Sequence, residues 1–89
     1  MLTEEFVLEM QAKLLYRRLS KQRVLQGGGE QALSHSYKDI ARIDFALKRI
    51  KQGQYGLCTN CGCIIDTLRL RLIPEAPFCA LCAQEIEAH

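Results

Sequence analysis

The stretch Gly53-Gln-Tyr-Gly-Leu-Cys58-Thr-Asn-Cys61-Gly62 decides the fold of this chain, together with Cys79-Ala-Leu-Cys82 further along. Each stretch holds two cysteines separated by two residues, and positions 62 to 78 lie between the two pairs. Two thiolates on one tight turn can reach adjacent corners of a tetrahedron about 2.3 Å from a single Zn²⁺, and the returning chain supplies the other two. The spacing therefore predicts one zinc ion with four ligands, namely Cys58, Cys61, Cys79 and Cys82. Four protein ligands leave no open position, which makes the site structural and not hydrolytic.

The fifth cysteine, Cys63, follows the first pair. We expect it to be a small buried apolar residue on a first strand, with ligand exchange or oxidation as the alternative. Five cysteines cannot pair completely within one chain, so metal binding explains them better than disulfides. The first ten residues carry three glutamates and no Lys or Arg, unlike a secretory signal. We therefore expect a cytoplasmic protein with reduced thiols.

The segment between the two cysteine pairs alternates apolar and basic residues in Leu68-Arg-Leu-Arg-Leu72. A repeat of two is typical of a strand with one buried face. The alternation predicts a short β-hairpin there, closed by Pro74 and Pro77. A short helix is expected after the second pair, over residues 83–88.

The first half of the chain has helical periodicity. Thr3 is a suitable N-cap, and Gly27-Gly-Gly29 interrupts the pattern, so we place a first helix over residues 3–25. Its apolar residues form two stripes, both expected in the core: Phe6, Met10 and Leu14, and Leu8, Ala12, Leu15 and Leu19.

A second helix is predicted over residues 37–52. Its seam consists of Ile40, Ile43, Leu47 and Ile50, spaced alternately three and four residues apart. Ser36 with Asp39 forms a possible capping box, while Leu33 continues the seam and allows an earlier start near Glu30. Gly53 is placed to end this helix.

Charge divides the chain at the same point. Residues 1–53 carry ten Lys/Arg and six acids (+4), and residues 54–89 carry two Arg and four acids (−2). We expect a helical hairpin over 1–53 and a zinc finger over 54–89, packed as one compact unit. The fold class is mainly α, with an antiparallel coiled-coil-like hairpin, a small β-hairpin and a short C-terminal helix. An 89-residue chain is too short for a two-lobed enzyme, and no catalytic motif is present, so we expect no enzymatic activity.

One long stretch of the chain is distinctive: it reads Ala41-Arg-Ile-Asp-Phe-Ala-Leu-Lys-Arg-Ile-Lys-Gln-Gly-Gln-Tyr-Gly-Leu-Cys-Thr-Asn-Cys-Gly62, with Ile65, Arg69-Leu70, Pro74 and Cys79-Ala-Leu-Cys82 after it. With these residues, the part of the chain over 37–87 resembles the DksA/TraR family of bacterial four-cysteine zinc-finger proteins. The resemblance implies a helical hairpin on a zinc-finger base, with the hairpin inserted into the secondary channel of bacterial RNA polymerase to modulate transcription. It also implies no sequence-specific contact with DNA and no membrane association, and we expect a monomer.

The hairpin tip departs from that family's pattern. Well-studied members carry an Asp-x-x-Asp pair there, whereas Gln26-Gly-Gly-Gly-Glu-Gln-Ala-Leu33 has Glu30 as its single carboxylate. Asp39 and Asp44 lie further down the second helix and are not assigned that role. Two alternative functions stay open: a nucleic-acid-binding zinc finger that uses the basic helices, and a zinc- or thiol-based redox-responsive module that uses Cys63.

Overall fold

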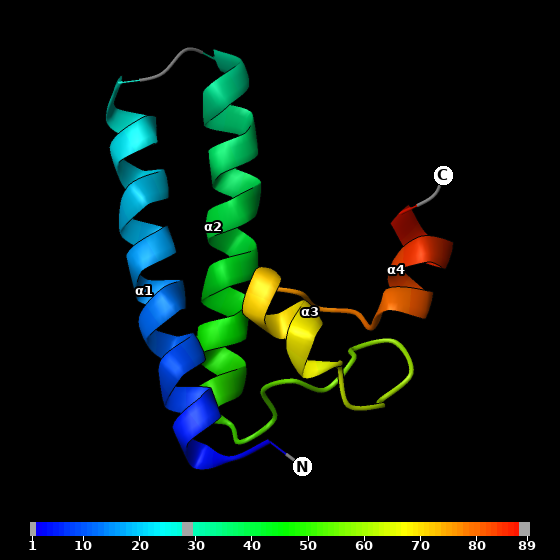
Figure 1. The fold of residues 1–89 in the computed structure, drawn as a ribbon. Helices are drawn as coiled ribbons and strands as arrows, with labels where there is room; N and C mark the ends of the chain where they lie inside the picture. The colour runs from blue at the N-terminus through cyan, green and yellow to red at the C-terminus, as the bar shows by residue number, and fades with distance from the viewer. Residues whose placement is uncertain (1, 28–29, 88–89) are drawn as a thin grey trace.

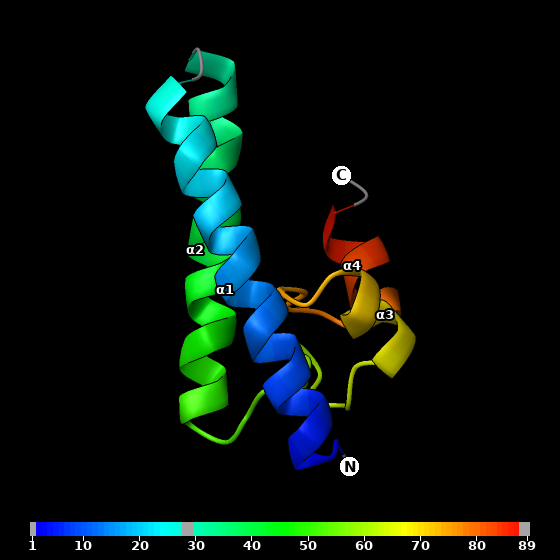
Figure 2. The same cartoon turned by 60° about the vertical axis from the view of Figure 1, so that its left-hand side comes forward.

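The fold is a long two-helix hairpin beside a small cysteine-bearing base. The structure, a computed structural model, describes residues 2–27 and 30–87, apart from the side chains of 24–36 and 87. In this range the helices are α1 (Glu4–Gly27), α2 (Glu30–Lys51), α3 (Thr67–Leu72) and α4 (Ala80–Glu87). Helices α1 and α2 run antiparallel, and the base, residues 54–87, lies beside the end where α1 begins and α2 ends (Figures 1 and 2). None of the helices in the described part of the chain has the length and apolar character needed to span a membrane.

Helix α1 begins where the sequence predicts. The Phe6 amide donates to the Thr3 hydroxyl at 3.1 Å, and the Val7 amide donates to the Thr3 carbonyl at 3.1 Å. Thr3 is therefore the N-cap, since its hydroxyl accepts from the Phe6 amide, which has no carbonyl partner within the helix, and its carbonyl accepts the first intrahelical bond.

This cap gives a first prediction. Thr3→Ala is expected to lower the free energy of unfolding by about 1 kcal/mol, because the Phe6 amide loses its hydroxyl partner. Asp66→Ala is the matched control, since Asp66 precedes α3 but its side chain makes no capping hydrogen bond. Urea unfolding of the zinc-loaded variants measures both, and equal losses would contradict the cap.

Helix α2 starts at Glu30, so the earlier of the two predicted starts is right and the capping box at Ser36 is wrong. Ser36 lies inside the helix and cannot cap its first turn. At the other end Gly53 has φ +71°, its amide donates to the Ile50 carbonyl, and the Gln54 amide donates to the Arg49 carbonyl. This pair of bonds is a Schellman motif, and it turns the chain out of the hairpin into the base.

The two arms are held together by a small apolar cluster and by two ion pairs. Leu14 of α1 packs with Ile43 and Ala46 of α2. Arg18 pairs with Asp44 at 2.7 Å, and Lys21 pairs with Asp39 at 3.0 Å. Exposed pairs of this kind contribute at most about 1 kcal/mol each, so packing supplies most of the stability of the hairpin.

One of the two predicted apolar stripes of α1 is not in the core. Phe6, Met10 and Leu14 are buried, but Leu8, Ala12, Leu15 and Leu19 are all exposed. With about 3.6 residues per turn the two stripes fall on roughly opposite sides of the helix, and α2 and the base cover only one of them.

The predicted β-hairpin over residues 68–72 is wrong, because this segment is helix α3. Leu70 is fully buried, while Leu68 and Leu72 are 68% and 76% exposed. Leu and Arg both favour helices, and in a helix residues two apart point to different sides. Among the described residues, the β-type pairing consists of one isolated bridge between Leu57 and Ile64.

The last predicted helix is confirmed, and it begins earlier than expected. Helix α4 starts at Ala80, so Cys82 lies in its first turn and not before it. The Ala83 amide donates to the Cys79 carbonyl at 2.9 Å, which ties this turn to the second cysteine pair. Residue 88, the expected end, lies outside the described residues.

Candidate metal centre

The structure brings the two predicted cysteine pairs together. The sulfur atoms of Cys58, Cys61, Cys79 and Cys82 all lie within 4.8 Å of one another, and those of Cys61 and Cys79 are 3.8 Å apart. In a tetrahedron with Zn–S bonds of about 2.3 Å, neighbouring sulfurs are about 3.8 Å apart. The four thiols therefore fit one zinc ion.

The first cysteine turn is shaped by its backbone. Gly62 has φ +79°, a conformation that glycine adopts without strain, and its amide donates to the Cys58 carbonyl at 2.9 Å. The Cys61 amide points to the Cys58 sulfur at 3.5 Å. Glycine directly after Cys61 thus lets the chain curl around the sulfur of the preceding cysteine.

Thr59 and Asn60, between the first two cysteines, connect the two turns. The Thr59 amide and hydroxyl both donate to the Pro77 carbonyl, at 2.9 and 3.0 Å. The Asn60 side-chain amide donates to the Cys82 sulfur at 3.3 Å. Sequence analysis assigned no role to these residues; their position inside the first Cys-x-x-Cys was the available signal. Asn60 is thus an outer partner of one predicted metal ligand, Cys82, while Thr59 ties the first cysteine turn to the segment before the second pair.

Hydrogen bonds prepare part of the cluster for metal binding. Burial acts to raise the pKa of the Cys58 thiol, but the backbone amides of Cys61, Cys79 and Asn60 outweigh it and lower this pKa to about 6. The Cys82 backbone amide is the largest influence on Cys79, whose pKa is also lowered. Both groups thus favour the thiolate form that zinc requires.

Cys63 is not the buried apolar residue that the sequence predicts. It is exposed, and its sulfur lies 3.0 Å from that of Cys61. The reason is that no strand forms there: the Cys63 carbonyl accepts from the Cys58 amide at 2.8 Å, and this bond keeps the residue on the cysteine turn.

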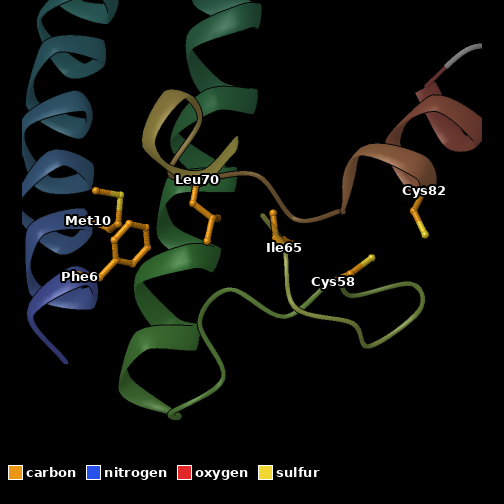
Figure 3. Close-up of a cluster of buried hydrophobic side chains, with 6 residues drawn as sticks. All are labelled: Phe6, Met10, Cys58, Ile65, Leu70 and Cys82. Atoms are coloured by element: carbon orange, nitrogen blue, oxygen red, sulfur yellow. The ribbon is translucent and has the colours of Figure 1, made fainter. Parts of the chain in front are cut away.

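The cysteine turns are connected to the hairpin by an apolar cluster (Figure 3). Its buried members are Phe6, Met10, Cys58, Ile65, Leu70 and Cys82, from α1 through α3 to both cysteine pairs. Two of the clustered cysteines thus belong to the same core as the first turns of α1. The position of the metal centre relative to the hairpin is set by packing.

Polar contacts between α1 and the base surround this cluster. Arg17 pairs with the buried Glu75 at 2.8 Å, and Arg71 pairs with Glu9 at 3.1 Å. The Tyr55 hydroxyl donates to the Pro74 carbonyl at 2.9 Å, and burial, helped by the negative charge of Glu75, raises the pKa of Tyr55. The two ion pairs fix the base against one side of α1, whereas the Tyr55 bond lies within the base.

Sequence relationships agree with this architecture. The family model of the prokaryotic dksA/traR C4-type zinc finger matches residues 53–88. An uncharacterized protein from Aquifex aeolicus (strain VF5) is 34% identical over 103 residues, covering 91% of this chain and 71% of the relative. This chain belongs to the DksA/TraR family. For this DksA/TraR protein, the C4 zinc finger and the clustered cysteines indicate one structural zinc ion.

Two solved structures share the complete fold of this DksA/TraR protein. The RNA polymerase binding protein and transcriptional regulator Dks from Chlamydia trachomatis L2 (LGV434) superposes with a TM-score of 0.81 at 27% identity, over 99% of this chain and 94% of its own. Transcription factor DksA2 from Pseudomonas aeruginosa gives 0.76 at 24% identity, over 96% and 85%, and shows likeness of fold alone.

Proposed function

We propose that this DksA/TraR protein binds bacterial RNA polymerase in the cytoplasm and modulates transcription, with the α1/α2 hairpin inserted into the secondary channel. The observation that carries the proposal is the match to Dks, an RNA polymerase binding protein, over nearly the whole chain. The match includes the hairpin as well as the zinc finger. In this role the protein is a monomeric regulator without catalytic activity, and it makes no sequence-specific contact with DNA.

The same proposal assigns the metal ligands and the division of the chain. Cys58, Cys61, Cys79 and Cys82 hold the zinc ion, which supplies a cross-link and no reaction chemistry. Residues 1–53 form the arm that reaches the polymerase, and residues 54–89 form the base that orients the arm. The cluster shared by α1 and the cysteines supports this arrangement, because the arm cannot tilt without disturbing that core.

The charges of the hairpin support a protein partner better than nucleic acid. Arg17, Arg18 and Lys21 of α1 all pair with acids of this chain, at 2.8, 2.7 and 3.0 Å. A nucleic-acid footprint requires cations that face outward to neutralise phosphates. These three cations are already paired with carboxylates of the same chain, which supports a protein partner over nucleic acid.

Retention on immobilised, purified bacterial RNA polymerase tests the proposal. Zinc-loaded protein should be retained at low salt in a 1:1 ratio, and nuclease treatment should leave retention unchanged. A variant that lacks residues 21–27 and 30–36 loses one heptad from each arm, which keeps the helix faces in register and shortens the hairpin by about 10 Å. We expect this variant to lose its effect on transcription in vitro.

Leu72→Ala is the matched control for that experiment, because Leu72 is exposed on the base and lies outside the arm. It should behave as the unmodified protein. Failure of the unmodified protein to bind polymerase would disprove the proposal. Retention that disappears with nuclease would establish the nucleic-acid alternative in its place.

A further inference from the structure

A fifth thiol lies against the metal centre, and the four-ligand site leaves it without a role. The Cys63 sulfur is 3.0 Å from the Cys61 sulfur. Cys63 therefore meets the site at Cys61, whose sulfur also lies 3.8 Å from that of Cys79.

The backbone holds Cys63 in this place. Its carbonyl accepts from the Cys58 amide at 2.8 Å, and the next residue, Ile64, forms the isolated β-bridge with Leu57. Gly62, with φ +79°, reverses the chain between Cys61 and Cys63. The two side chains thus leave the same short loop and reach the same side of the cluster.

Burial distinguishes this side from the other. Cys58 and Cys82 are 2% and 7% exposed and belong to the apolar core, whereas Cys61 and Cys63 are both exposed. A ligand can be replaced most easily where both the incoming and the outgoing thiol reach water without disturbing packed side chains. The corner of the zinc tetrahedron at Cys61 meets this condition, because Cys61 and Cys63 are both exposed there.

We propose that Cys61 and Cys63 share one corner of the zinc tetrahedron, so that Cys63 is an alternative zinc ligand that replaces Cys61. The exchange forms a Zn–S bond to Cys63 and breaks the one to Cys61. The proton lost by the Cys63 thiol is taken up by the released Cys61 thiolate through solvent, so no oxidant is needed. The inference rests on the ligand set assigned above, since it names a fifth residue for the same zinc site.

Cobalt and zinc titrations of the full-length apoprotein test the exchange. Cys61→Ser should still bind one equivalent of Co²⁺, with the sulfur-to-cobalt charge-transfer intensity of four thiolates, and should keep zinc affinity within about tenfold of the parent. Cys63→Ser should do the same through Cys61. The double variant Cys61→Ser/Cys63→Ser should show the sulfur-to-cobalt charge-transfer intensity of three thiolates. It should also bind zinc far more weakly than either single variant.

Cys58→Ser is the matched control, because it removes one thiol at a buried corner. It should show three thiolates and a large loss of affinity. If Cys61→Ser behaves like Cys58→Ser, the exchange proposal is wrong while the four-ligand site stands. If Cys58→Ser keeps four-thiolate cobalt, the assigned ligand set is wrong, and the exchange proposal fails with it. Neither result depends on polymerase binding, which the pull-down measures separately.

Brief alkylation of the zinc-loaded parent protein adds a measurement that needs no variant. Iodoacetamide followed by mass mapping should give about one label per molecule, divided between Cys61 and Cys63, with the other three cysteines protected. Labelling confined to Cys63 would make Cys61 the permanent ligand and would overturn the proposal.

Discussion

Zinc removal by a strong chelator is expected to unfold the base. Residues 54–87 contain two short helices and one isolated bridge among their described elements, and Cys58 and Cys82 belong to the cluster that holds the base to α1. Without the metal the cross-link between the two cysteine turns is lost. Structural zinc contributes of order 10 kcal/mol or more to folding, which exceeds what so small a core supplies.

Amide hydrogen exchange measures this effect residue by residue. The Ile65 amide donates to Gly56 at 2.7 Å and the Leu70 amide to Asp66 at 3.0 Å, so both should exchange slowly with zinc and at nearly the unfolded rate without it. The amide of Ile43 in α2 is the internal control and should keep more of its protection. Added zinc should restore the base. Unchanged protection of Ile65 and Leu70 in the apoprotein would contradict a structural metal.

Leu70→Ala is expected to be the most damaging single leucine substitution in α3. Leu70 is fully buried between α1 and the cysteines, so truncation removes apolar contacts and leaves a cavity, at a cost of about 3–5 kcal/mol. Urea unfolding of zinc-loaded protein, followed by circular dichroism, measures the change. We also expect Leu70→Ala to expose the base to proteolysis, because α1 loses its contact with α3.

Leu68→Ala is the matched control on the same helix. Leu68 is 68% exposed, and its truncation should change the free energy of unfolding by no more than about 0.5 kcal/mol. On a β-strand, residues 68, 70 and 72 would share one face, and their alanine variants would have similar effects. Similar losses for Leu68→Ala and Leu70→Ala would therefore contradict the helix.

In α3, the alternation of leucine and arginine was not sufficient to predict the secondary structure. Three leucines at alternate positions match a strand, but a strand needs a neighbour, and the bridge between Leu57 and Ile64 is the β-type pairing the described base provides. A six-residue segment is also too short for the helical period to be visible. The packing of Leu70 against α1 decides the outcome, and that contact joins residues about 60 positions apart.

Helix α1 illustrates the same limit. Its two apolar stripes are equally regular in sequence, and either could have faced the core. Phe6, Met10 and Leu14 are buried because the base and α2 both pack on that side, whereas Leu8 and Leu15 face outward. Which stripe is used depends on where the base docks, and helical periodicity carries no information about that.

The cysteines illustrate both what the sequence determines by itself and what depends on the tertiary structure. The sequence by itself determined that two Cys-x-x-Cys turns meet, that two helices form a hairpin, and that Gly53 ends the second, because these features depend on covalent spacing and local backbone preference. Only the tertiary structure decided the helical state of α3, the outward stripe of α1 and the position of Cys63 beside Cys61. Each of these depends on which surfaces meet in space.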